Sequence, residues 1–181
     1  LTDGNDEISL VTSQGYSVRT SEENIRPMGR PSAGVAGIRP GKGDYLVALA
    51  VVDNSEQLLV VSEKGLGKRT PFEDYPTKGR GGKGVITMKV TEKTGRVVKA
   101  LRVAAEDDIM LMTDTGQSVR IKAESARLTG RNAQGVILMK TKDGETIQDI
   151  ARVVSEDDEG GEAESIDAEG TTSPVEEQDQ D

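Results

Sequence analysis

The chain has 181 residues, with 32 acidic and 23 basic side chains, and it contains no Cys, His or Trp. These absences exclude disulfides, Cys or His metal ligands, and mechanisms that need a histidine base or a cysteine nucleophile. No apolar run approaches the roughly 20 residues of a membrane-spanning helix, and no signal peptide is recognisable. We expect a soluble protein of a reducing compartment, without membrane contact.

The net charge of −9 averages two different regions. Residues 155–181 hold twelve acidic residues and no Lys or Arg, whereas residues 1–154 hold 23 basic and 20 acidic residues and carry +3. The few apolar residues of 155–181 cannot bury enough surface to offset the entropy of ordering, so this acidic tail is predicted to be disordered.

The first predicted elements of the body are hairpins that recur three times. The stretches DEISLVTSQGYSVRT, EQLLVVSEKGLGKRT and DDIMLMTDTGQSVRI each contain an apolar strand, a polar turn with glycine, and a second strand that carries a cation. The apolar runs 8–12, 58–62 and 109–113 are too short for helices. The glycines at 15, 65 and 116 suit a turn position with positive φ.

The similarity between the three stretches continues downstream at a spacing of 50 and 51 residues. Gly-Arg recurs at 29–30, 79–80 and 130–131, and Gly-Val at 34–35, 84–85 and 135–136. So many coincident columns indicate an internal repeat, with units at about 1–52, 53–104 and 105–154.

Two further strands complete each predicted unit. After the closing glycine, aliphatic residues at 36/86/137 and 38/88/139 are expected inside, and Arg39, Lys89 and Lys140 outside. The fourth strands are YLVALAVV, VVKALRVA and TIQDIARVV. Four strands in about 50 residues is typical of a propeller blade. The sequence therefore predicts an all-β, propeller-like domain of about three four-stranded blades over residues 1–154, part of a larger ring or an open arc.

The run GRGGKG at residues 79–84 formally fits the dinucleotide pattern G-x-G-x-x-G. That fold requires a strand before the run and a helix after it. Here a polar loop precedes the run and the short, β-branched VITMKV follows, so the dinucleotide interpretation is rejected. A surface loop whose glycines only permit a turn remains an alternative for any single run.

The cations recur at the same positions of each unit, and stacked blades would align them into a stripe. A ligand with regularly spaced negative charge, such as duplex DNA, fits such a stripe. Single-strand binders usually offer aromatic platforms, and this chain has only three Tyr and one Phe. No recognition helix is apparent, so we expect backbone contact with little sequence specificity. The predicted DNA-binding residues are Arg19, Arg30, Arg39, Lys68, Arg69, Lys78, Arg80, Lys83, Lys89, Arg120, Arg131 and Lys140.

The segments GLGKRTPFEDYPTKGRGGKGVITMKV (65–90) and GRNAQGVILMKT (130–141) resemble the C-terminal domain of bacterial DNA gyrase A. The resemblance implies a β-pinwheel whose blades exchange strands, and a basic rim that wraps and bends DNA to support ATP-dependent negative supercoiling. It implies no catalytic residue, metal or cofactor in this chain, since ATP and magnesium act elsewhere in the type II topoisomerase. The implied partners are double-stranded DNA, the rest of gyrase A and its companion gyrase B, in the bacterial cytoplasm at the nucleoid.

The chain departs from the family's Q-R-R-G-G-K-G box, because Lys78 and Gly79 replace its first two letters. Only the DNA-contact roles of Arg80 and Lys83 are therefore carried over. Two other functions stay open: the equivalent domain of topoisomerase IV, which decatenates DNA, and a propeller that acts as a protein-interaction scaffold.

The acidic tail leads to a prediction. Twelve negative charges tethered to the body have a high effective concentration near its cations and compete with DNA for them. We expect deletion of residues 156–181 to tighten binding of a random-sequence duplex in a gel-shift titration. Equal affinities for the full and shortened chains would contradict the competition and leave a solubilising end.

Overall fold

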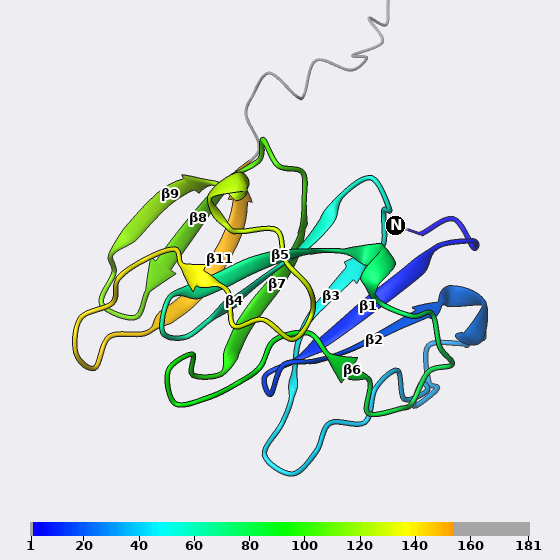
Figure 1. Cartoon of the computed structure of the whole chain (residues 1–181). Coiled ribbons are helices and arrows are strands. Elements are labelled where there is room, and N and C mark those ends of the chain that lie inside the picture. Colours follow the sequence, from blue (N-terminus) through cyan, green and yellow to red (C-terminus); the bar gives the residue numbers. More distant parts are fainter. Residues whose placement is uncertain (1, 154–181) are drawn as a thin grey trace, which may run out of the picture.

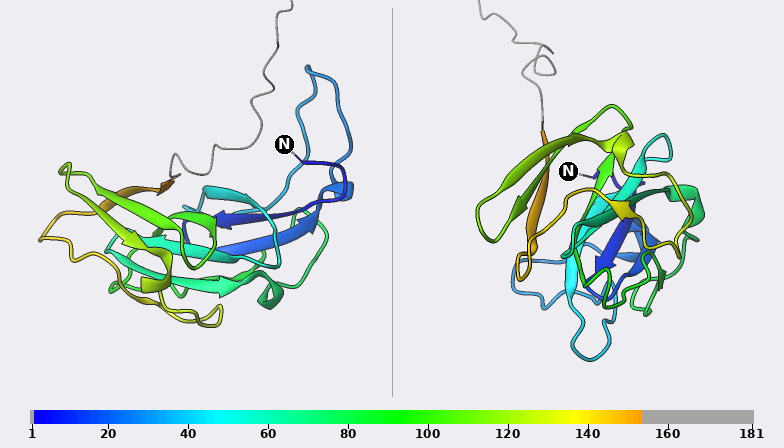
Figure 2. Two further views of the ribbon diagram at one scale, coloured as in Figure 1. Left: turned by 90° about the horizontal axis from the view of Figure 1, so that it is seen from above. Right: turned by 60° about the vertical axis from the view of Figure 1, so that its left-hand side comes forward.

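The structure is a computed structural model that describes residues 2–153. It contains three antiparallel sheets that follow one another in chain order (Figure 1), and Figure 2 shows them from two further sides. The all-β prediction is confirmed. The only helices in this part of the chain are three one-turn 3₁₀ helices, η1 (Glu22–Asn24), η2 (Phe72–Asp74) and η3 (Ala123–Ser125). The predicted disorder of residues 155–181 lies outside the described residues.

Each sheet forms one blade. The strands of blade 1, in spatial order, are β3 (Leu46–Val51), β1 (Glu7–Thr12), β2 (Tyr16–Ser21) and β6 (Val85–Ile86). Those of blade 2 are β10 (Val136–Ile137), β5 (Leu66–Pro71), β4 (Gln57–Ser62) and β7 (Val97–Val103). Those of blade 3 are β11 (Ile147–Val153), β8 (Asp108–Thr113) and β9 (Ser118–Lys122).

The fourth strand of a blade comes from the next repeat. β6 belongs to the second repeat and pairs with β2 of the first, and β10 of the third repeat pairs with β5 of the second. In register, Tyr16 opposes Ile86 and Leu66 opposes Ile137. The strand exchange implied by the resemblance is therefore present. The third strand of the second and third repeats is short and completes the sheet of the preceding repeat, so blades 1 and 2 each contain strands from two repeats.

The repeated glycines permit this strand exchange. Gly65 has φ +75°, and its backbone passes so close to the third repeat that a Cβ would overlap the carbonyl oxygen of Met139. Gly135 has φ +84°, and a Cβ there would overlap the carbonyl oxygen of Gly67. At the first junction the equivalent Gly15 and Gly84 approach the carbonyl oxygens of Met88 and Ser17 in the same way. The closing glycine of the loop therefore lies against protein backbone, and not against a ligand.

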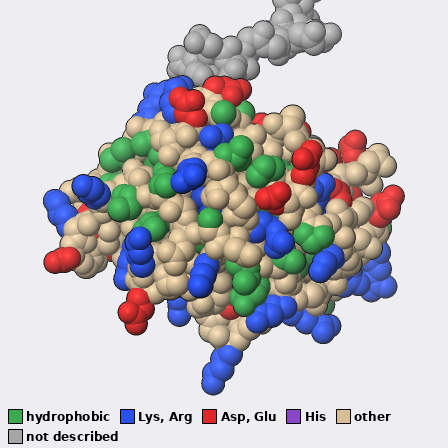
Figure 3. Space-filling view, in the orientation of Figure 1, with side chains coloured by type: hydrophobic (Ala, Val, Ile, Leu, Met, Phe, Trp, Pro, Cys, Tyr) green, Lys and Arg blue, Asp and Glu red, His purple; other side chains and the backbone are tan. Residues whose placement is uncertain are grey.

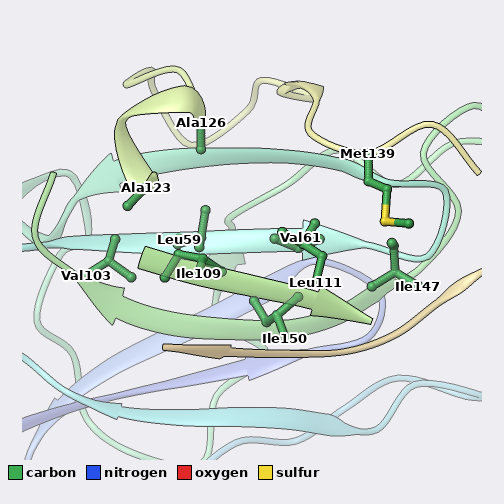
Figure 4. Close-up of a cluster of buried hydrophobic side chains, with 10 residues drawn as sticks. All are labelled: Leu59, Val61, Val103, Ile109, Leu111, Ala123, Ala126, Met139, Ile147 and Ile150. Atoms are coloured by element: carbon green, nitrogen blue, oxygen red, sulfur yellow. The ribbon is translucent and has the colours of Figure 1, made fainter. Parts of the chain in front are cut away.

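The core lies between the blades. Along β4 all four residues 58–61 have 0% exposure, and alternate side chains point to opposite faces of the sheet. Leu58 and Val60 pack toward blade 1, whereas Leu59 and Val61 pack toward blade 3. Figure 4 shows the cluster around Leu59 and Val61, where side chains from blades 2 and 3 meet. Each such aliphatic side chain contributes about 1.5–3 kcal/mol, so the blades stabilise one another.

The predicted alternation of buried and exposed residues fails at the donated strands β6 and β10. Met88 and Met139 are buried as expected, but Ile86 is 40% and Ile137 57% exposed. The chain bends directly after each two-residue strand. A regular period of two does not continue through a bend, so both isoleucines face outward.

Two alanine variants separate the cost of positive φ from the cost of the overlap between a Cβ at residue 65 and the carbonyl oxygen of Met139. Gly65 and Gly116 both have positive φ (+75° and +83°), but a Cβ at Gly116 has no described neighbour within 4 Å. Both Gly→Ala changes should lose about 1–3 kcal/mol through strain. Gly65→Ala should lose about 1–3 kcal/mol more through the overlap. Urea unfolding of the two variants measures the difference, and equal losses would show that the approach is unimportant.

Candidate nucleic-acid interface

The positive charge of the body is concentrated in three loops. Residues 25–43, 76–91 and 125–142 each contain four Lys or Arg and no Asp or Glu. The remainder of residues 1–154 holds 11 basic and 20 acidic residues. Each loop runs from a 3₁₀ helix toward the last strand of the same repeat, β3, β7 or β11, and these three are the inner strands of the blades. Figure 3 shows Lys and Arg side chains spread over the lower half of one face, with Asp and Glu more frequent toward the top.

Several cations outside the loops are paired with acids. Lys99 of β7 lies 2.7 Å from Asp149 of β11, and Arg152 lies 3.1 Å from Asp107. These ion pairs join or brace the inner strands. The loop cations are therefore the main source of positive charge that a polyanion can reach.

Nine of the twelve predicted DNA-binding residues have accessible side chains. Eight are exposed and Arg131 is half-buried. The exposed residues are Arg30, Arg39, Lys78, Arg80, Lys83, Lys89, Arg120 and Lys140. All except Arg120 lie in the three acid-free loops. Arg120 lies on β9 and forms an ion pair with Asp108.

The structure corrects the placement of Arg19 and Arg69, which are only 8% exposed. The Arg19 guanidinium forms an ion pair with Glu7 and donates to the carbonyl oxygen of Phe72 in the next blade at 2.7 Å. The Nε of Arg69 donates to the carbonyl oxygen of Ala126 at 2.9 Å. The following blade covers both side chains, so they tie blades together and cannot line a DNA-facing stripe.

Lys68 is also buried, with 0% exposure. Its Nζ donates to the carbonyl oxygens of Arg131 and Gly130 at 2.6 and 2.7 Å, and to Thr70 Oγ1 at 3.3 Å. Burial lowers the pKa of this ammonium to about 8, and the nearby charge of Arg131 acts in the same direction. Lys68 therefore holds the turn that presents Arg131, and does not itself reach a phosphate.

The recurrent Gly-Arg motif has a shared structural role. Arg80 Nη1 donates to the carbonyl oxygen of Ala36, and Arg131 Nη1 to that of Ile86, each at 3.3 Å. Ala36 and Ile86 occupy equivalent repeat positions, so each arginine binds the loop of the preceding repeat. Arg80 Nε also donates to the carbonyl oxygen of Asn24 at 2.8 Å. Since a guanidinium has five N–H donors, the exposed Arg80 retains donors for a phosphate.

The glycine-rich run borders a hollow of about 240 Å³ against β2. Its cationic lining includes Lys78 and Lys83. The Nζ of Lys83 lies 4.5 Å from the ring centroid of Tyr16, a cation–π contact that positions the ammonium without neutralising it. The hollow and its two lysines can accept an anionic group.

Metal and cofactor binding find little support among residues 2–153. Three carboxylates, Asp3, Asp6 and Glu22, come close enough together to share a cation. The Glu22 carboxylate accepts from the backbone N–H of Asp6 at 2.8 Å, so the cluster also has a structural role. The expectation that this chain needs no metal or cofactor stays a prediction. None of the described helices has the length and hydropathy to span a bilayer.

The sequence interpretation missed four exposed cations of the acid-free loops, Arg26, Lys42, Arg127 and Lys142. Arg26 and Arg127 share one repeat column, but the second repeat has Pro76 there, and Lys42 and Lys142 recur in no column. The absence of acids over each whole loop is the signal that identifies them.

Comparison with known proteins gives a consistent result. The family model described as DNA gyrase C-terminal domain, beta-propeller, matches residues 6–53, 56–104 and 107–153. The chain is 40% identical over 166 residues to the DNA gyrase A protein of Pseudomonas aeruginosa, covering 92% of this chain and 18% of that protein. It is 44% identical over 159 residues to the Escherichia coli K12 gyrase A protein, covering 88% and 18%. The chain thus spans about a fifth of these relatives.

Two solved structures share the fold. A DNA gyrase A C-terminal domain superposes with a TM-score of 0.79 at 24% identity, covering 84% of this chain and 52% of that structure. The C-terminal domain of a DNA topoisomerase IV gives the same TM-score and identity, with coverage of 84% and 48%. At this identity the two structures show the fold alone.

The buried Lys68 leads to a pH prediction. The pKa of a lysine in the unfolded chain is about 10.4, above the folded value of about 8. The unfolded chain therefore binds the proton more tightly between these values, and the native protein gains stability as pH rises from about 8 to 10. Lys68→Met lacks this contribution. Urea unfolding at about pH 7.5 and 9.5 should show native stability rising relative to the variant, and a constant difference would contradict the assignment.

Proposed function

The chain belongs to the DNA gyrase C-terminal domain family, and on this premise we propose that it is a non-catalytic, DNA-bending segment of a bacterial gyrase A protein. The observation that carries this proposal is the set of three acid-free loops, of which 76–91 and 125–142 are each fixed on the preceding blade by strand exchange. Each loop offers four cations, and each lies one blade farther along the array. Such a track suits the backbone of double-stranded DNA.

The cost of bending DNA can be offset by electrostatic contacts between the loop cations and the DNA phosphates. Bending 20–30 base pairs by 40–90° costs on the order of 1–6 kcal/mol. A protein with 6–10 phosphate contacts binds strongly enough at modest salt to offset that cost, but loses about 10³–10⁵ in affinity between 50 and 200 mM salt. The loops contain enough Lys and Arg for this number of contacts. DNA binding is therefore expected to be strong only at modest ionic strength.

In the complete enzyme, the proposed role is to bend DNA for negative supercoiling. The partners are the rest of gyrase A and the companion gyrase B, where ATP and magnesium are used. The two relatives named above come from bacteria, and we place the chain in the bacterial cytoplasm, in contact with nucleoid DNA.

Topoisomerase IV remains the second candidate, because one of its C-terminal domains shares the fold. The identity of 40–44% to gyrase A proteins favours gyrase. An enzyme assembled with this chain should supercoil relaxed plasmid more efficiently than it decatenates linked circles. The opposite preference would support topoisomerase IV. A protein scaffold, in contrast, would not shift a random-sequence duplex in a gel.

A single-lysine comparison tests the proposed track. Lys89 lies in an acid-free loop and is exposed, whereas the exposed Lys122 of β9 lies 3.2 Å from Asp108. Lys89→Gln should weaken binding about equally for all duplex sequences and reduce the slope of log K against log salt by about 1. Lys122→Gln should leave both nearly unchanged. Equal effects of the two variants would show that the loops are not the contact surface.

A further inference from the structure

Each blade junction has a hollow beside the donated strand. At the junction of blades 2 and 3 the hollow measures about 330 Å³ and is lined by Lys64, Leu66, Lys93, Ile137, Met139, Lys140 and Thr141. At the junction of blades 1 and 2 it measures about 200 Å³ and is lined by Gln14, Tyr16, Ile86, Met88, Lys89 and Val90.

The two hollows are equivalent by repeat. Ile137 corresponds to Ile86, and Lys140 to Lys89, at a spacing of 51 residues. Both hollows therefore combine an apolar floor with a lysine from an acid-free loop. Because the hollow recurs at both blade junctions, it is a consequence of the repeated fold. An elongated ligand that runs along the blades could contact both hollows.

The outward isoleucines have no role in the cores described above. Ile137 is 57% and Ile86 40% exposed, and each lies on the outermost strand of its sheet. An exposed aliphatic side chain among cations suits a ligand that alternates apolar and anionic groups. The sugar–phosphate backbone of DNA does so, since each deoxyribose lies between two phosphates.

The hollow of blades 2 and 3 is the more cationic of the two. Lys64, Lys93 and Lys140 are all exposed, and the hollow's lining includes no acid. The Nζ of Lys64 donates to the carbonyl oxygen of Glu92, which fixes its ammonium beside the hollow and leaves two N–H donors. At the equivalent position the other hollow has the neutral Gln14.

We propose that the hollow of blades 2 and 3 binds the DNA sugar–phosphate backbone, with deoxyribose against Ile137 and phosphate oxygens on Lys64 and Lys93. This inference rests on the proposed function and deepens it, because Lys64 and Lys93 lie outside the acid-free loops. The hollow of blades 1 and 2 makes the same contact more weakly, since it has one lysine in place of three.

The test measures binding of the full chain to a fluorescent 30-base-pair random duplex across a salt series. The double change Lys64→Gln and Lys93→Gln should weaken binding about tenfold at low salt and reduce the salt slope by about 2. Lys64→Arg with Lys93→Arg should retain the affinity, because the charge remains. Ile137→Ser should weaken binding about threefold with an unchanged slope, as loss of an apolar contact requires.

Leu49→Ser is the matched control for the isoleucine, because Leu49 lies on β3 with 58% exposure and outside both hollows. It should bind like the native chain. If the glutamine pair and Ile137→Ser also bind like the native chain while Lys89→Gln binds more weakly, the hollow is not a contact site and the proposed function stands. If the native chain does not bind the duplex at low salt, both proposals fail.

Discussion

The structure depends on the two-residue strands that the second and third repeats each add to the sheet of the repeat before them. Each strand reaches the sheet only because glycines remove side chains where two backbones approach, at Gly65 and Gly135 in the second junction. Addition of the strand fixes the loop around it at the outer edge of the neighbouring blade. Because the loops hold the excess positive charge of the body, one backbone contact sets both the stacking of the blades and the position of the cations.

The basic residues accordingly divide into two groups. Arg19, Lys68 and Arg69 are buried and donate to carbonyl oxygens of the next blade. Each of these hydrogen bonds ties a backbone group of the following repeat to the blade before it. The exposed loop cations have few protein acceptors. Arg80 and Arg131 combine both roles, because each uses some N–H donors to bind the preceding repeat and keeps the others free. The buried cations therefore anchor the backbone of the following repeat, and the exposed cations project from the loops toward solvent.

The sequence predicts the hairpins well, because short apolar runs and turn glycines determine them locally. The repeat also predicts the number of blades. Burial of Arg19 and Arg69 could not be predicted in this way, because it depends on which face the next blade covers. The outward turn of Ile86 and Ile137 depends on a bend after two residues. The closing glycines show the same limit, since a pattern that permits close approach does not say whether DNA or protein approaches.

Amide hydrogen exchange of the full chain, with and without a random-sequence duplex at low salt, tests the central claim most directly. We predict that bound DNA slows exchange in residues 25–43, 76–91 and 125–142, with little change along the inner strands β3, β7 and β11. Protection confined to the inner strands, or to a single blade, would contradict a track of cations fixed by strand exchange.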